Sequence, residues 1–337
     1  MTILSVLDQS PIRKDGSPAQ AVQETLELAQ LCDRLGYHRY WLAEHHSTPS
    51  LAGSAPEILI GRVAALTRRI RVGAGGIMLS HYAPLKVAES FRTLETLYPG
   101  RIDLGIGRAP GGDAQTAQAL AVGPGSLGLE HFPHQIKYLL DFLKNEGDAE
   151  LQSGSVHAQP LGDCVPELWL LGSSDASAGY AAHFGLPFCF AHFINADGGP
   201  RVVDAYRQHY TPSPRYPQPK GSLGIFVICA DTHEKAEALA HSRDLFLLKL
   251  RTGEPIAIPS PEEASAYPYS EIERQLVQAN RAQTVIGTPE QVRERLQAMA
   301  AQYDVGEIVV VTITYDFDAR KRSYELLAQA FGLTAEA

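Results

Sequence analysis

The sequence predicts an α/β protein whose eight strands close into a (β/α)8 TIM barrel rather than an open doubly wound sheet. Three observations lead to this fold class. Short apolar, β-rich segments alternate with segments of helical period along the chain. The length of 337 residues suits one barrel. Hydrophobic residues make up 45% of the chain and charged residues 20%, which is enough apolar material for a large core. We therefore expect a single domain over residues 1–337.

The strands are expected at the short apolar runs, which cover residues 2–7, 40–43, 70–73, 102–106, 168–171, 188–190, 223–229 and 307–314. The helices are expected at 18–35, 56–66, 84–94, 131–145, 174–183, 197–210, 232–250 and 319–331. The first helix has the clearest ends. Ser17 as N-cap, Pro18 at N1 and Gln20 at N3 form a capping-box start, and Gly36 ends the helix.

Two segments interrupt the alternation. Residues 109–128 are rich in Gly, Pro and Ala, and we expect a loop with a short helical piece. A longer irregular insertion runs from residue 251 to about 284, after the seventh strand and before Thr288 and Pro289 start another helix. A long irregular segment in a compact domain is usually a lid or a mobile segment, and in a barrel it lies on the catalytic face.

Charge and cysteine content exclude several classes of function. The chain has 29 Lys and Arg against 38 Asp and Glu, a net charge of −9, which argues against nucleic acid or an anionic membrane as the main partner. No apolar run approaches the length of a transmembrane helix, and residues 1–9 lack the basic start of a secretory signal. The 4 cysteines form no Cys-x-x-Cys pair, so we expect free thiols in the cytoplasm.

The sequence Glu44-His45-His46 directly follows the second strand, where a barrel places its active-site side chains. His45 is the candidate proton-transfer group, because an imidazole exchanges protons near neutral pH. The alternative is a histidine satisfied in the core or at an interface. A metal site that includes His131 and His134 is a further alternative. Neighbouring residues of an extended segment point to opposite faces, however, so we expect no metal.

The next two strand ends carry features that suit a flat, phosphorylated ligand. Gly75 and Gly76 lie in a run of small residues that lets the backbone approach a flat ligand, or else marks a bulge at the barrel rim. No Gly-x-Gly-x-x-Gly motif of a Rossmann dinucleotide site is present. Arg108 follows the fourth strand, where its guanidinium is placed to bind a phosphate or to pair with a surface carboxylate.

The fifth strand ends in a serine-rich turn that starts a helix. Ser173, Ser174 and Ser177 offer hydroxyls beside a helix N-terminus, which suits a phosphate, although plain N-capping explains them too. Asp175 would repel an anion, so we expect it to face away. Four strand ends thus carry groups that suit one ligand: a proton-transfer group, a flat wall, an arginine and a phosphate-binding turn. Together they indicate a phosphorylated planar cofactor such as FMN.

The chain resembles the bacterial luciferase-like flavin monooxygenases, and in particular the FMN-dependent luciferase-family oxidoreductases that open with Ser-Val-Leu-Asp-Gln-Ser-Pro. The matching motifs occur in the family's order over nearly the whole chain, at residues 5–11, 41–46, 71–79, 99–108, 170–174 and 286–290. The resemblance implies a (β/α)8 barrel and a homodimer with His46 and Glu89 at its interface. It also implies that residues 251–284 form a mobile lid that shields the flavin from water.

The resemblance further implies the roles of the candidate site residues. His45 corresponds to the catalytic histidine of the family. Gly75 and Gly76 fall where the family holds a non-proline cis peptide against the flavin ring. Arg108 corresponds to an arginine that pairs with the FMN phosphate, and the three serines correspond to its phosphate loop. Luciferase itself has a cysteine where this chain has Gly107, and alanines at the two glycine positions. These departures speak against light emission and a long-chain aldehyde substrate.

The function that the resemblance implies is a two-component monooxygenase. The enzyme would take reduced FMN from a separate NAD(P)H:flavin reductase, form a C4a-hydroperoxyflavin with O2, and oxygenate a small organic substrate. The alternatives are an F420-dependent hydride-transfer oxidoreductase, a non-catalytic flavin-binding protein, and a metal-dependent barrel hydrolase. The candidates for the substrate wall are Tyr82, Phe190, His192 and Phe193, each of which also suits simple packing.

Overall fold

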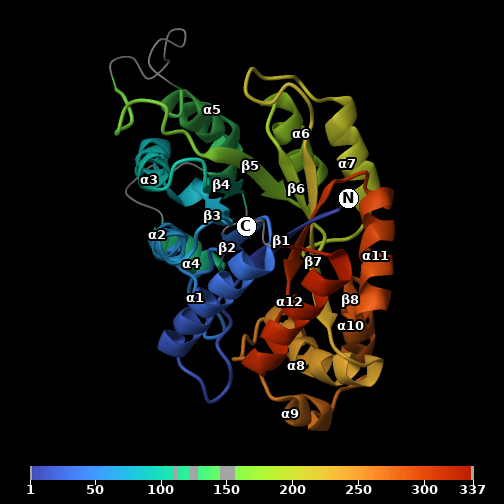
Figure 1. Cartoon of the computed structure of the whole chain (residues 1–337). Coiled ribbons are helices and arrows are strands. Elements are labelled where there is room, and N and C mark those ends of the chain that lie inside the picture. The colour runs from blue at the N-terminus through green and yellow to red at the C-terminus, as the bar shows by residue number, and fades with distance from the viewer. Residues whose placement is uncertain (1, 109–111, 121–127, 145–155, 335–337) are drawn as a thin grey trace.

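The computed structural model describes residues 2–108, 112–120, 128–144 and 156–334. Eight parallel strands form a closed barrel in which each strand pairs with the next and the last returns to the first (Figure 1). These strands are β1 (Ile3–Asp8), β2 (Arg39–Leu42), β3 (Arg71–Met78), β4 (Ile102–Gly107), β5 (Glu167–Gly172), β6 (Phe188–Ala191), β7 (Gly221–Cys229) and β9 (Glu307–Val311). The predicted (β/α)8 barrel is confirmed.

A ninth strand, β8 (Thr284–Gly287), was not predicted from the sequence. It pairs with the C-terminal half of β7, where Phe226 is opposite Thr284 on one edge and Val311 of β9 on the other. Strand β8 therefore extends the edge of β7 beyond the end of the short strand β6, which pairs with β7 only up to Gly224.

The helices cover the outside of the barrel (Figure 1). They are α1 (Pro18–Leu35), α2 (Pro56–Leu66), α3 (Pro84–Leu97), α4 (Ala114–Leu120), α5 (Phe132–Phe142), α6 (Asp175–His183), α7 (Gly199–Gln208), α8 (His233–Arg251), α9 (Pro261–Ala266), α10 (Glu271–Ala282), α11 (Pro289–Gln302) and α12 (Phe317–Phe331), with short 3-10 turns at Leu79–His81 and Leu129–His131. The predicted start and end of α1 are confirmed, because Ser17 accepts the N–H of Gln20 and Gly36 is left-handed with φ 86°. Of the expected capping box, the structure has the serine half of the exchange.

The predicted loop at 109–128 contains α4 as its helical piece, and residues 109–111 and 121–127 lie outside the described part of the chain. The helix expected at 131–145 starts as a 3-10 turn and is α-helical only to Phe142, with residue 145 outside the described residues. Among the described residues, no helix is both long enough and apolar enough to cross a membrane.

The expectation of an irregular insertion at 251–284 is wrong, because most of this segment is helical. Helix α9 starts at the N-cap Ser260, and α10 starts with a complete capping box between Ser270 and Glu273. Both helices pack against α8, with Leu245 and Leu248 of α8 in one apolar cluster. The three helices lie together at the lower end of the molecule in Figure 1.

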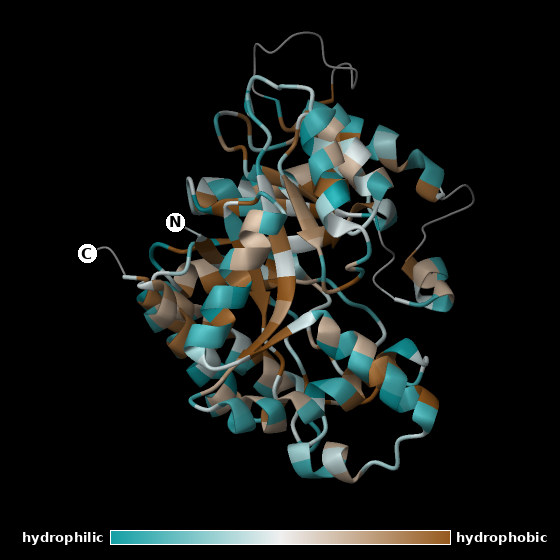
Figure 2. Ribbon diagram, turned by 90° about the vertical axis from the view of Figure 1, so that its right-hand side faces the viewer, coloured by the Kyte–Doolittle hydropathy of each residue, from teal (hydrophilic) through white to brown (hydrophobic). Residues whose placement is uncertain are grey.

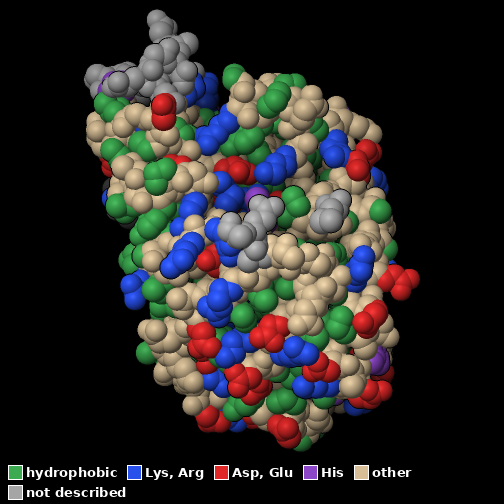
Figure 3. Space-filling view, viewed as in Figure 1, with side chains coloured by type: hydrophobic (Ala, Val, Ile, Leu, Met, Phe, Trp, Pro, Cys, Tyr) green, Lys and Arg blue, Asp and Glu red, His purple; other side chains and the backbone are tan. Residues whose placement is uncertain are grey.

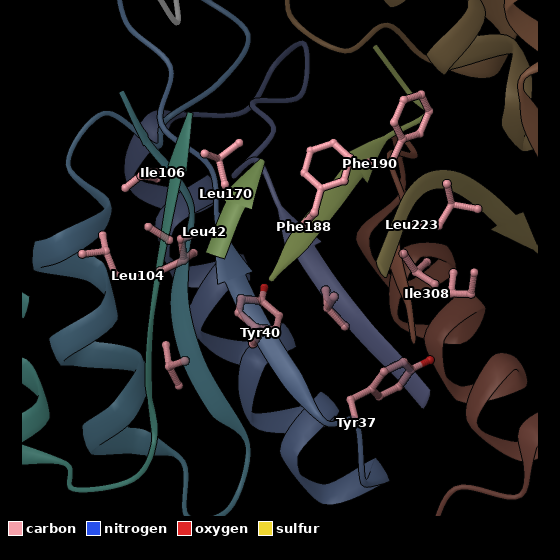
Figure 4. Close-up of a cluster of buried hydrophobic side chains, with 14 of the residues drawn as sticks. Tyr37, Tyr40, Leu42, Leu104, Ile106, Leu170, Phe188, Phe190, Leu223 and Ile308 are labelled. Carbon is pink, nitrogen blue, oxygen red and sulfur yellow. The ribbon is translucent and has the colours of Figure 1, made fainter. Parts of the chain in front are cut away.

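The main core lies between the barrel and the outer helices. Alternate strand residues such as Leu4 and Val6 point outward into it, and apolar helix faces cover them. Figure 2 shows the hydrophobic strands enclosed by helices of mixed polarity, and Figure 4 shows ten labelled side chains of this core. On the face seen in Figure 3, acidic and basic side chains lie beside each other over the lower helices, and Lys321 of α12 pairs with Glu27 of α1 at 2.7 Å.

The N-terminal end of the barrel interior is closed by charged residues. Arg39 is fully buried and binds Asp103 and Glu307, each at 2.6 Å. Trp41 and Trp169 lie against this ion pair: the Arg39 guanidinium is 4.9 Å from the Trp169 ring, and the two indoles meet edge to face at 5.5 Å. With this end filled, the space available for a ligand lies at the opposite, C-terminal end of the strands.

Candidate active site

His45 lies at the C-terminal end of the barrel, just after β2. The apolar side chains inside the barrel form a barrel-interior cluster, made of Leu7, Trp41, Ala43, Leu51, Trp169, Cys189, Phe226, Phe246, Leu247, Ile258, Val309, Val311 and Ile313. The alternation that places Trp41 and Ala43 in this cluster also places His45 on the inward side. Its backbone N–H donates to the Gly53 carbonyl at 2.8 Å, and its side-chain Nδ1 is buried without a hydrogen-bond partner among the described residues. Burial, and to a lesser extent the charge of His46, lowers the pKa of His45 to about 4. The imidazole is therefore neutral at pH 7 and has a nitrogen free to bind or exchange a proton.

The neighbouring Glu44 carboxylate, only 1% exposed, joins β2 to the end of β3. It accepts hydrogen bonds from the His46 Nε2 at 2.7 Å, the Tyr82 hydroxyl at 2.6 Å and the Met78 backbone N–H at 2.9 Å. His46 thus binds a residue of its own chain. Tyr82 is tied to Glu44 rather than standing free as a substrate wall. This network fixes the backbone on both sides of His45.

The peptide bond between Gly75 and Gly76 is cis, as the family resemblance predicts. A Cβ atom added to Gly75 would lie 2.8 Å from Leu7 Cδ1 and 3.0 Å from Trp41 Cβ, both in the barrel interior. A Cβ atom added to Gly76 would lie 2.7 Å from the Gly105 carbonyl oxygen. These glycines therefore form a wall without side chains, set directly on the packed interior residues.

Beside this wall, β4 ends in an open position. A Cβ atom added to Gly107 would meet nothing within 4 Å. The next residue, Arg108, is half-buried, and it has no hydrogen-bond or ion-pair partner among the residues that the structure describes. The alternative of a surface arginine paired with a carboxylate is thus not found there. A half-buried guanidinium without a partner suits an anionic ligand.

The serine-rich turn after β5 starts α6 as expected. The Ser174 hydroxyl accepts the Ser177 N–H at 3.4 Å and lies 3.2 Å from the Ser177 hydroxyl, so both serines take part in the N-cap. Ser173 is half-buried, and no described residue bonds its hydroxyl. Asp175 is exposed. The turn thus combines a helix cap with a free hydroxyl and the N-terminus of a helix.

Of the other candidates for the substrate wall, Phe190 and His192 are packed against Tyr303, and Phe193 lies against the barrel interior. Phe190 is fully buried in the outer core, with its ring 5.7 Å from that of Tyr303, so its assignment to the wall is wrong. His192 is also buried against Tyr303, with ring centroids 6.0 Å apart. Phe193 packs on the barrel-interior ring of Phe226 at 5.6 Å and remains a candidate. Strand β6 has only four residues, so the sequence pattern does not determine which of them face the barrel interior.

Among the described residues, no group of three or more His, Cys, Asp and Glu side chains is arranged to hold a metal ion. His131 and His134 lie near each other at the start of α5, with 6.0 Å between their ring centroids.

Sequence reasoning missed two features of this end of the barrel. One is the role of Glu44 as the acceptor for three donors, and the other is a buried arginine of α8, Arg243.

The chain belongs to the luciferase-like monooxygenase family, whose sequence model matches residues 2–304. Uncharacterized protein YceB of Bacillus subtilis is 46% identical over 98% of this chain and 100% of its own. N-acetyl-S-alkylcysteine monooxygenase of the same organism is 36% identical over 98% of each chain. The crystal structure of apo-MsnO8 superposes with a TM-score of 0.90 at 39% identity, over 99% of each chain.

More distant structures share the fold but differ in cofactor. The oxygenating constituent of 3,6-diketocamphane monooxygenase, in complex with FMN, has a TM-score of 0.71 at 20% identity. An F420-dependent secondary alcohol dehydrogenase has a TM-score of 0.66 at 13% identity. At these identities the likeness shows the barrel alone, so the choice of cofactor depends on the residues of the site.

Proposed function

We propose that this protein is the oxygenase component of a two-component flavin monooxygenase. It takes reduced FMN from a separate NAD(P)H:flavin reductase and uses O2 to oxygenate a small organic substrate. The observation that carries this proposal is the arrangement of three successive strand ends. A neutral histidine with a free nitrogen follows β2, a wall of glycines lies near the end of β3, and an arginine without a partner among the described residues follows β4.

The residues present fit FMN. The Gly75–Gly76 backbone offers a flat surface for the ring system, because neither residue carries a side chain of its own. Arg108, the Ser173 hydroxyl and the N-terminus of α6 offer a guanidinium, a hydroxyl and N–H groups to the phosphate. Ser174 and Ser177 shape this turn through their cap. When bound, reduced FMN supplies the two electrons that activate O2.

His45 then handles a proton beside the bound ring. Its Nδ1 has no partner within the described protein, and its low pKa keeps the ring neutral, so it can accept a proton or hold one in a hydrogen bond. Glu44 is a positioning residue, because it binds His46, Tyr82 and the backbone of Met78 rather than His45 itself.

The insertion after β7 serves as the cover that keeps water away from the reaction. Ile258 is fully buried in the barrel-interior cluster together with Leu51, Phe246 and Leu247. Its backbone N–H donates to the Ile12 carbonyl at 2.9 Å, and its carbonyl accepts the Lys14 N–H at 2.8 Å. These bonds fasten the start of the insertion to the loop after β1. A dry site favours oxygen transfer over release of H2O2.

A homodimer is part of the proposal. Glu89 of α3 lies beside a surface groove of about 750 Å³ that also includes Glu57 and Lys86. Ile58 of α2 and Leu97 of α3 are 71% and 62% exposed nearby on the same pair of packed helices. Sedimentation velocity on the wild type and on Glu89→Arg tests this surface. We expect a dimer that the variant weakens, and a monomeric wild type would refute it.

An anaerobic titration tests the choice of cofactor. Reduced FMN and reduced F420 are added separately to the protein under argon, and binding is followed by flavin fluorescence and tryptophan quenching. We expect reduced FMN to bind in a 1:1 ratio and F420 to bind far more weakly. Tighter binding of F420 would favour the hydride-transfer alternative. The relative that oxygenates N-acetyl-S-alkylcysteines makes these thioethers the first substrates to try.

A further inference from the structure

Arg243 of α8 is buried at the C-terminal end of the barrel, and it takes no part in the proposed flavin site. It is 1% exposed. Phe246 and Leu247, three and four residues further along the same helix face, belong to the barrel-interior cluster. The Arg243 guanidinium lies 4.4 Å from the ring centre of Phe226, an inward-facing residue of β7 in that cluster. The arginine therefore faces the barrel mouth rather than solvent.

The charge of Arg243 is poorly compensated within the protein. Its Nε and Nη1 atoms are buried and have no hydrogen-bond partner in the described part of the chain. The carboxylate paired with it, Asp244, has its Oδ1 atom 3.6 Å from Nη1, beyond hydrogen-bond distance, and its Oδ2 atom already binds Arg281 Nε at 2.6 Å. A buried guanidinium without hydrogen bonds is costly, so a site of this kind is built to receive an acceptor from elsewhere.

The same region holds further unsatisfied polar atoms. Of the 12 buried side-chain atoms without partners among the described residues, six belong to Ser242, Arg243, Asp244 and Asn280. Asn280 is 1% exposed on α10, next to Arg281, and both polar atoms of its amide lack partners. Helices α8 and α10 pack together, so these unpartnered donors and acceptors lie on two neighbouring helices.

We propose that Arg243 binds the carboxylate of the substrate, so that the enzyme acts on small organic acids. This inference rests on the proposed oxygenase function and adds the substrate class to it. The planar guanidinium matches a carboxylate with two parallel hydrogen bonds, and the contact with Phe226 holds it flat. The rest of the substrate then extends past Phe193 and Phe226 toward the glycine wall of β3.

Binding of an acid and of its uncharged amide tests this assignment directly. The probes are N-acetyl-S-methylcysteine and its carboxamide, titrated by calorimetry into the wild type under argon with FMN present. Acetate is the minimal carboxylate probe. The melting temperature of the protein is measured in acetate and in chloride at equal ionic strength. We expect the wild type to prefer the acid by about 30-fold or more, because a desolvated charge-assisted pair is lost in the amide.

Variants then assign the preference to Arg243. Arg243→Gln is expected to abolish the preference for the acid and the stabilisation by acetate, and Arg243→Lys to retain only part of both, because lysine lacks the planar fork. The control is Arg274→Gln, on the exposed side of α10, which should behave as the wild type. A wild type that treats acid and amide alike, including no binding of either, overturns the assignment even if the variants fail to fold.

The titrations also separate this inference from the proposed function. A preference for the acid that survives in Arg243→Gln overturns the role of Arg243, while 1:1 binding of reduced FMN by the same protein leaves the oxygenase function standing. Failure of reduced FMN to bind the wild type removes the proposed function, and the inference that rests on it falls with it.

Discussion

Replacing His45 with glutamine should remove a pH dependence of stability that the burial of this imidazole creates. Burial and then His46 lower the pKa of His45 from 6.5 to about 4. Between these two values the unfolded chain binds a proton at this position that the folded chain does not. Folding stability therefore falls as the pH drops through 6.5, and this contribution levels off below pH 4. At pH 5 the loss relative to pH 8 is about 2 kcal/mol.

Urea unfolding of the wild type and of His45→Gln between pH 5 and pH 8 measures this contribution. Other groups titrate over the same range, but they are common to both proteins and cancel in the difference between the two unfolding free energies. We expect the wild type to lose about 2 kcal/mol more than the variant on going from pH 8 to pH 5. His233→Gln, on the exposed start of α8, is the matched control and should follow the wild type.

Parallel curves of unfolding free energy against pH for the wild type and His45→Gln would be the contrary result. They would mean that the folded protein holds His45 at its ordinary pKa, and a neutral imidazole with a free Nδ1 could no longer be assumed in the site. The same variant should keep its affinity for reduced FMN, because Gly75, Gly76 and Arg108 are unchanged.

Three further outcomes follow from named contacts. Arg108→Met should weaken binding of reduced FMN by about 10- to 100-fold without lowering the melting temperature, and unchanged affinity would remove Arg108 from the phosphate site. Ser270→Ala should lower the free energy of unfolding by about 1 kcal/mol, because α10 loses its N-cap. Urea unfolding measures this change, and an unchanged midpoint would show that the cap does not stabilise the fold. Arg39→Met removes the buried guanidinium that Asp103 and Glu307 share and should destabilise the fold by about 3–5 kcal/mol, although Asp103 keeps Arg71 and Glu307 keeps the Ser5 hydroxyl; a fully stable variant would show that these remaining partners suffice.

The elements that sequence reasoning placed well are those with local chemical signals. The first helix was located to the residue because a serine cap, a proline and a terminal glycine act within one turn. The cis bond at Gly75 was available only through family resemblance, since a glycine pair in isolation also suits a bulge. The helices of the insertion were missed, although Ser260-Pro261 and Ser270 with Glu273 are start signals of the same kind.

Other features depend on tertiary structure and have no local signal. A charged residue in the middle of a helix ordinarily faces solvent, and only the packing of α8 over the barrel buries Arg243. Arg39 and Asp103 stand near the starts of strands, where a polar residue also suits a turn, and only closure of the barrel brings them together at 2.6 Å. Glu44 was adjacent to the candidate histidine, but its partner Tyr82 lies 38 residues away.

The most direct test of the account is rapid mixing of the protein, loaded with reduced FMN under argon, with oxygenated buffer. The flavin spectrum is followed by stopped flow, and H2O2 is measured at the end. An oxygenase component should give a transient flavin species, distinct from reduced and oxidised FMN, that outlives the reaction of free reduced FMN with oxygen and decays without stoichiometric H2O2 when a substrate is present. Immediate reoxidation with one H2O2 per flavin, at the rate of free FMN, would contradict it.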